Sequence, residues 1–508
     1  MESKNLRKDM TKVQLLALSF SAMFGSGWLF APLYAAQIAG PAALLAWAIA
    51  GLMSLMIGLV MAEVVALFPS SGGLSSIAKR THGDGLSIYV TVLNLIVFIL
   101  LPALEVRAVL QYLSSYIDGL MVGDQMSGLG YFVSFSLLAS ITLVNLYGVK
   151  TIGYLTDIVA VFKVATPILI CITFLYAIAN HEGLDHARLF TGSPSLSAIP
   201  WTQVFQSIAM SGIIFSYNGF NQATLFAGEA KDPAKAIPFA LVGSILITGL
   251  LYILVQYVFI MAIPEAFLSE GWAKLSFPGD KGPFVGMATL LGLGWIISLI
   301  YIDAVVSPLG TGFTYASAAP RLLHSLGESL PALSPILKLN RFGISHFAVF
   351  SVLLAECLSF VFLPDLKAMI SLLVADFVLC YTIAPASLLT LRRTMPQLPR
   401  IFKLKYAKIT SYLAFLCSDL MVFSCGWIAL RNLMVLTFSF IVIYLLLRGR
   451  ERFQTLARGS FWFVFQLSSL SILAYIHYEQ ALSFSTILVT LAGISAVSLF
   501  VASRSPKL

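Results

Sequence analysis

The chain has 508 residues, 59% of them hydrophobic and only 11% charged, and its formal net charge is +8. A soluble domain carries about 25% charged residues, so this composition excludes a water-soluble protein. The apolar residues fall in repeated runs of about 20, the length that crosses a bilayer as a helix. We therefore predict an all-α membrane protein with many spans.

About fourteen apolar segments are predicted to span the membrane, by length and hydropathy. They lie at 12–36, 42–67, 86–117, 129–147, 154–179, 201–228, 237–263, 285–318, 343–362, 367–391, 409–430, 432–447, 461–477 and 485–502. The eleventh and twelfth almost touch, and we place their boundary at Arg431.

The basic residues orient these spans. With a cytoplasmic N-terminus, 24 of the 31 Lys and Arg residues fall in cytoplasmic segments. This asymmetry follows the positive-inside rule and predicts that both termini are cytoplasmic. The positive charge is then explained by topology and by contact with anionic lipid, and no nucleic-acid partner is expected.

Two predicted spans are interrupted near their middle by glycine and polar residues. The interruptions are Gly25-Ser26-Gly27 in the first span and Ser216-Tyr217-Asn218-Gly219-Phe220 in the sixth. Backbone leaves the helix at membrane depth only where it is buried in protein or lines a polar cavity. A matched pair of broken helices in corresponding positions of two halves indicates the central site of a transporter. The alternative is close helix packing through small residues.

The residue types around the breaks suit a small amphipathic ligand. A helix that restarts after the first break presents free N–H groups and a positive dipole end, which favour a carboxylate. Aromatic side chains would cover the ligand, and polar ones would satisfy its polar groups. The predicted substrate-binding residues are Gly25, Ser26, Gly27, Trp28, Phe215, Ser216, Tyr217, Asn218 and Phe220.

Lys163 lies inside the apolar fifth span. A buried ammonium is costly, so such a lysine can release its proton within a useful range. It is therefore the predicted proton-coupling residue. The alternative is a lysine whose long side chain reaches the cytoplasmic interface.

Secondary candidates are the other ionisable or polar residues within spans, namely Glu105, Arg107, Asp303 and Ser307. Glu105 and Arg107 are two residues apart and need not face each other. Asp303, Ser307 and Thr311 share one face of the eighth span by their spacing. Each has an alternative role in helix packing. Glu63, Asp157, Glu356, Asp376 and Asp419 lie nearer span ends or in later helices and rank lower.

Motifs for other functions are missing from the sequence. The five cysteines and six histidines show no metal-ligand spacing, and there is no GxxxxGK[ST] phosphate loop. No nucleophile, histidine and acid fall together in the spans. We expect no enzyme activity, no metal and no cofactor.

Several segments carry a resemblance to a known family. They are Phe24-Gly25-Ser26-Gly27-Trp28-Leu29-Phe30, Gly40-Pro41-Ala42-Ala43, Phe68-Pro69-Ser70-Ser71-Gly72-Gly73, Asn145-Leu146-Tyr147-Gly148-Val149-Lys150, and Phe215 to Phe220 running into Gly228-Glu229-Ala230-Lys231-Asp232-Pro233. Through roughly its first 445 residues the chain resembles the amino acid–polyamine–organocation superfamily. Within it, Leu291-Gly292-Leu293-Gly294-Trp295 and Asp303-Ala304 resemble the bacterial aspartate–proton symporter branch.

The resemblance implies a LeuT-like fold with two inverted five-span repeats. The implied organisation is a cytoplasmic tail (1–11), a ten-helix core (12–391, with repeats at about 12–179 and 201–391), four accessory helices (409–502) and a second tail (503–508). It also implies that Lys163 takes the place of a sodium ion, and that backbone at Ser26-Gly27 and at 215–218 holds a substrate carboxylate and amine. Two features depart from the family pattern: Ala319-Pro320-Arg321 after the eighth span, and Arg107, which either binds a second carboxylate or neutralises Glu105.

The sequence thus predicts proton-coupled symport of an amino acid across the cytoplasmic membrane, with a lean to acidic amino acids. Two alternatives remain open: an amino-acid exchanger without net proton coupling, and a non-transporting sensor. The sequence predicts neither the identity of the amino acid nor the oligomeric state.

Overall fold

The computed structural model describes residues 10–70, 72–114, 116–123, 125–147, 149–180, 201–277, 282–329, 331–362, 366–448, 450–479 and 482–505. Most of the predicted N-terminal tail (1–9) and the end of the predicted C-terminal tail (506–508) lie outside these residues. The described chain is largely helical, as predicted, with a short antiparallel ribbon of β1 (Met121–Val122) and β2 (Gln125–Met126).

The first predicted span consists of two helices. Helix α1 (Lys12–Met23) begins with a capping box, in which Thr11 and Gln14 each accept a hydrogen bond from the backbone N–H of the other. It ends at Met23, and α2 (Gly27–Ala39) begins after a three-residue gap. The turn η1 (Gly40–Ala42) then leads into α3 (Ala43–Leu67). The structure confirms the interruption that the first glycine pair predicts.

The sixth predicted span is divided into short helices. They are α9 (Trp201–Met210), α10 (Ile213–Tyr217), α11 (Gln222–Leu225) and η4 (Ala227–Glu229). Gly219 lies between α10 and α11 with φ of +110°. A Cβ atom there would come within 2.8 Å of the Ala22 backbone and 2.6 Å of the Tyr315 hydroxyl. The second break therefore requires glycine both for its dihedral angle and for its close approach to α1.

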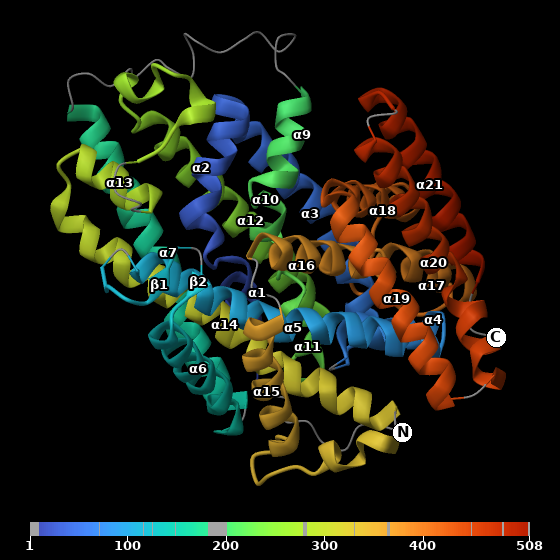
Figure 1. The fold of residues 1–508 in the computed structure, drawn as a ribbon. Helices are drawn as coiled ribbons and strands as arrows, with labels where there is room; N and C mark the ends of the chain where they lie inside the picture. The colour runs from blue at the N-terminus through green and yellow to red at the C-terminus, as the bar shows by residue number, and fades with distance from the viewer. Residues whose placement is uncertain are drawn as a thin grey trace.

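The chain up to residue 394 holds further helices (Figure 1). They are α4 (Gly73–Thr81), α5 (Asp84–Leu113), α6 (Gly128–Leu143), η2 (Val144–Tyr147), α7 (Val149–Asn180), α12 (Pro233–Met261), η5 (Glu265–Leu268), η6 (Trp272–Lys274), α13 (Pro283–Leu290), α14 (Gly294–Ser329), η8 (Pro331–Leu337), α15 (His346–Phe362), α16 (Leu366–Tyr381) and α17 (Ile383–Thr394). The prediction of one span at 285–318 is wrong. The chain turns between α13 and α14. Gly292, with φ of +68°, follows the end of α13.

The last four helices gather on one side of the molecule (Figure 1). They are α18 (Ala407–Ser424), α19 (Gly426–Arg448), α20 (Arg450–Tyr478) and α21 (Phe484–Arg504). The predicted boundary at Arg431 is wrong, because the chain turns at Cys425 and Arg431 lies inside α19. Gly426 has φ of +80°, a left-handed conformation that glycine adopts without strain.

Eleven helical stretches of the described chain have the length and hydropathy to cross a membrane. The stretch Gly27–Leu67 holds α2 and α3, and therefore parts of two predicted spans. The interrupted segments α1 and α9 to α11, and the short α15, fall below the length limit. The chain is a multi-pass membrane protein, with helices at each of the fourteen predicted segments.

The last two helices meet the rest of the protein at His82, in the turn between α4 and α5. His82 Nε2 donates a hydrogen bond to the Ala502 carbonyl of α21 at 3.1 Å, and Nδ1 lies 2.8 Å from the Thr81 hydroxyl. The ring packs against Trp462 of α20, with centroids 5.5 Å apart. Burial lowers the pKa of His82 to about 4, although its hydrogen bond to Ala502 opposes the shift. A neutral histidine therefore anchors the accessory helices.

This anchor predicts a pH-dependent stability. The unfolded chain binds a proton at His82 near pH 6.5, but the folded protein does so only near pH 4. The contribution to the free energy of unfolding is thus fully present above pH 6.5 and is lost as the pH falls toward 4, by about 3 kcal/mol at most. We expect His82→Gln to reduce the loss of thermal stability in detergent between pH 7 and 4.5. The exposed His477→Gln serves as control, and an unchanged pH profile for His82→Gln would contradict the assignment.

Candidate functional site

The two breaks are tied to each other by side chains. The Ser19 hydroxyl on α1 donates a hydrogen bond to the Phe220 carbonyl at 2.8 Å and accepts one from Ala223 N at 3.1 Å. The Tyr252 hydroxyl on α12 lies 2.9 Å from the Met23 carbonyl and 3.2 Å from the Ser216 carbonyl, so its one proton is within reach of both. Helix ends leave backbone groups without partners, and these two side chains satisfy several of them. Sequence reasoning missed both, because neither stands out within its apolar helix.

A carboxylate occupies the start of α2. Glu105 Oε2 accepts a hydrogen bond from Ser26 N at 3.1 Å, and the Glu105 side chain is fully buried. A Cβ atom on Gly25 would overlap the other oxygen of this carboxylate, so glycine is required for the approach. The free N–H groups and positive dipole end of α2 favour an anion at this position. The place predicted for a ligand's carboxylate is thus held by Glu105.

Lys163 on α7 points to the other side of the same break. Its side chain is fully buried, so it does not reach the membrane interface. Lys163 Nζ donates to the Ser21 carbonyl at 2.8 Å, the Phe24 carbonyl at 2.6 Å and Thr311 Oγ1 at 2.7 Å. The Thr311 hydroxyl in turn donates to the Ser21 carbonyl at 2.8 Å. An ammonium therefore lies at the C-terminal, negative end of α1 and joins it to α14.

Polar residues follow one face of α14, as their spacing predicts. Asp303 accepts hydrogen bonds from Trp28 Nε1 at 3.0 Å and from Ser307 Oγ at 2.9 Å. Thr311, four residues further, contacts the first break, and Tyr315 lies four residues beyond it, beside Gly219. Sequence reasoning missed Tyr315, although the same four-residue spacing indicates it.

Other predicted site residues lie at the second break with different surroundings. Tyr217 donates to the Trp47 carbonyl of α3 at 3.0 Å, so its hydroxyl serves the contact between helices. Phe220 packs against Tyr381, with centroids 4.9 Å apart, while Phe215 stays partly exposed. Gly27 leaves room for the Ser216 side chain. Arg107 is buried on α5.

Four buried polar atoms beside the breaks have no hydrogen-bond partner within the described residues. They are Ser21 Oγ, Asn218 Nδ2, Tyr315 Oη and, at the start of α11, Gln222 Oε1. Buried polar groups are nearly always paired, so orphaned ones mark a place where water or a ligand binds. Tyr315 Oη of α14 lies beside Gly219, and Asn218 is the preceding residue of the break between α10 and α11. The second break therefore offers hydrogen-bonding capacity to a ligand.

A separate set of contacts lies at the ends of α1, η4 and α14, on the N-terminal side of the breaks. Arg321 Nε pairs with Glu229 Oε1 at 3.1 Å, and its guanidinium lies over the Phe226 ring. The Met10 backbone forms a parallel bridge with the chain at Ala230, through Met10 N to the Glu229 carbonyl and Lys231 N to the Met10 carbonyl, both at 3.0 Å. These contacts join the start of the chain, η4 and α14 to one another.

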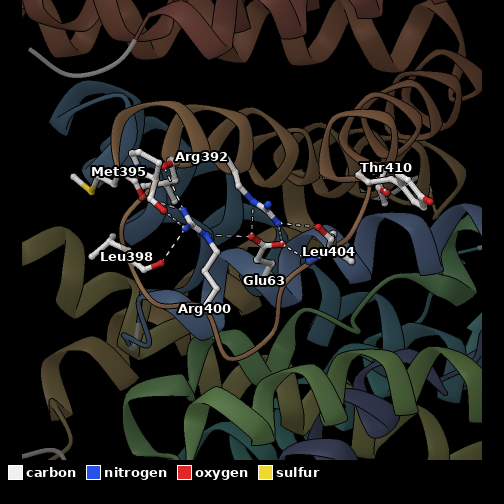
Figure 2. Close-up of polar contacts among 10 residues, drawn as sticks. Glu63, Arg392, Met395, Leu398, Arg400, Leu404 and Thr410 are labelled. Carbon is white, nitrogen blue, oxygen red and sulfur yellow. Dashed lines mark hydrogen bonds and ion pairs between the residues drawn. The ribbon is translucent and has the colours of Figure 1, made fainter.

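A buried ion cluster joins α3 to the loop after α17 (Figure 2). Glu63 accepts two hydrogen bonds from Arg392, at 2.9 and 2.8 Å, and one from Leu404 N at 2.8 Å. Arg400 Nε lies 3.3 Å from the same carboxylate and its other nitrogens donate to loop carbonyls. Glu63 is fully buried. The cluster ties the loop after α17 to α3. It is not part of the site at the breaks.

The sequence and the fold were compared with those of known proteins. A sequence model described as amino acid permease matches residues 11–449. The chain is 29% identical to the glutamate/serine transporter AimA of Bacillus subtilis, over 94% of this chain and 88% of that protein. It is 30% identical to the aspartate-proton symporter of the same organism, over 87% and 84%. Its structure resembles that of a manganese transporter of Eremococcus coleocola with a TM-score of 0.53 and 11% identity, covering 97% and 95% of the chains, which shows a shared LeuT-like fold.

The Glu63 cluster generates a stability prediction. Glu63→Gln leaves two arginines around an uncharged side chain, and breaking a buried ion pair costs about 3–5 kcal/mol. We expect a clearly lower unfolding temperature of the purified protein in detergent. Glu270→Gln removes the exposed pair with Lys274 and is the control, because exposed pairs contribute at most about 1 kcal/mol. Equal unfolding temperatures for the two variants would show that the cluster is not stabilising.

Proposed function

We infer the function from the premise that this chain belongs to the amino acid permease family. It is a membrane transporter rather than an enzyme. We propose that it carries an amino acid across the cytoplasmic membrane together with protons, with a preference for acidic amino acids, and that both termini are cytoplasmic. The distribution of basic residues supports this orientation. The names of the two relatives, which refer to glutamate, serine and aspartate, support the substrate class.

The observation that carries the proposal is the bonding of Lys163. An ammonium has three N–H donors, and Lys163 uses all three on Ser21, Phe24 and Thr311. A neutral amine has only two N–H donors. Loss of the proton therefore breaks at least one of these bonds and weakens the tie between α1 and α14. Proton release and movement of the first broken helix are linked by this geometry.

Glu105 links the proton to the substrate. Its carboxylate accepts from Ser26 N, the donor that a substrate carboxylate would use. An incoming amino acid therefore displaces Glu105, which then takes up a proton. Binding of the substrate and protonation of the site favour each other by this exchange. Asn218 and Tyr315 supply further polar contacts at the second break.

Reconstituted protein in liposomes tests the proposal. We expect uptake of glutamate, aspartate or serine to rise with an inward proton gradient, and Lys163→Ala to abolish that dependence. Lys163→Arg is a second variant, because arginine keeps the charge but does not release a proton. Lys235→Ala, at an exposed lysine, is the matched control. Uptake by Lys163→Ala that still follows the proton gradient would overturn the assignment.

The same liposomes distinguish symport from exchange. A symporter accumulates labelled amino acid in liposomes that hold no internal substrate, because the proton gradient supplies the driving force. An exchanger requires internal amino acid. We expect uptake into empty liposomes with the wild-type protein, and strict dependence on internal substrate would favour the exchanger.

A further inference from the structure

One hydrogen bond connects the restarting half of the first broken helix to α14. Trp28 Nε1 donates to Asp303 Oδ2 at 3.0 Å, and Ser307 Oγ donates to Asp303 Oδ1 at 2.9 Å. Trp28, Asp303 and Ser307 are all fully buried.

The contact lies on the far side of the breaks from the N-terminus. Thr311 of α14 touches the end of α1, and Asp303 is eight residues earlier, about 12 Å along the helix. Trp28 is in the first turn of α2, beyond the break. The Arg321–Glu229 pair lies on the opposite side of the breaks. In the proposed orientation, the Trp28–Asp303 bond is extracellular to the breaks.

The Trp28 ring covers the first break. It stacks with Phe24, the residue that precedes the gap, at 5.9 Å between centroids, and packs against Phe284 of α13 at 5.1 Å. Phe284 in turn contacts Phe174 and Phe259. The indole is thus the inner part of an aromatic layer, and Asp303 holds its only polar atom.

We propose that the Trp28–Asp303 hydrogen bond is a latch that keeps the substrate site closed on the extracellular side. An indole N–H and a carboxyl group in an apolar interior are costly unless each has a partner. In the closed protein they satisfy each other. When α2 moves away from α14, water enters and hydrogen-bonds to the Trp28 N–H and to the Asp303 carboxyl group. Neither group is then left unpaired in the open arrangement, and the direct bond between them stabilises the closed one. The inference rests on the proposed transport function for its orientation, but its test requires no transport.

Hydrogen–deuterium exchange of the intact protein in lipid nanodiscs tests the latch. Trp28→Phe keeps an aromatic ring and removes the N–H donor. Because one buried hydrogen bond is lost, we expect amides of α2 and α13 to exchange about tenfold faster, which corresponds to about 1.4 kcal/mol. Asp303→Ala removes the acceptor and is expected to give the same pattern. Trp295→Phe, the same change at an exposed position of α14, is the matched control and is expected to exchange as wild type.

Asp303→Asn separates the latch from a role for charge. The asparagine oxygen still accepts from Trp28, and its amide donates to Ser307, so we expect α2 and α13 to exchange as in the wild type. Wild-type exchange of α2 in both Trp28→Phe and Asp303→Ala would overturn the latch. Exchange of α2 in Asp303→Asn that is as fast as in Asp303→Ala would also overturn it, because Asp303 would then act through its charge. Either variant that unfolds is identified by its unfolding temperature, and the other then decides. A negative result for Lys163→Ala leaves this test unaffected, so the two proposals fail separately.

Discussion

Backbone that leaves the helix inside a membrane must find partners within the protein, and the rest of this structure depends on that requirement. The two breaks free carbonyl and amide groups at the ends of four half-helices. Side chains from four other positions satisfy them: Ser19, Glu105, Lys163 and Tyr252. Each bond also joins two helices that are distant in sequence. The same contacts that make the breaks possible therefore assemble the centre of the protein.

The charges at the first break are arranged in the order that helix dipoles favour. A carboxylate lies at the positive start of α2, and an ammonium lies at the negative end of α1. An amino acid carries these same two groups. In the proposed mechanism, Glu105 and Lys163 supply these two charged groups in the empty site. The substrate carboxylate then competes with Glu105 for Ser26 N. Because Lys163 needs its proton for all three bonds, the charge state of the site is linked to the packing of α1 against α14.

Contacts of two kinds lie on either side of the breaks. On the N-terminal side an ion pair and a backbone bridge connect η4, α14 and the start of the chain. On the other side Trp28 and Asp303 lie in an aromatic layer. The accessory helices contact the rest of the protein through His82, and Asp419 of α18 joins them to one another by accepting from Ser495 at 2.6 Å and from Gln466.

Much of this protein follows from the sequence by itself. Apolar length determined the spans, the glycines at 25, 27 and 219 marked the breaks, and the four-residue spacing placed Asp303, Ser307 and Thr311 on one face. These features are local, because hydropathy, backbone conformation and helical period depend on neighbouring residues. The turns at Gly292 and Gly426 were missed, since an apolar run hides a single left-handed glycine. Only the tertiary structure decided that Glu105 reaches Ser26, that Lys163 points inward, and that Trp28 meets Asp303 across 275 residues. Such partners are chosen by helix packing between distant segments, where the cost of leaving a buried polar group unpaired selects the arrangement.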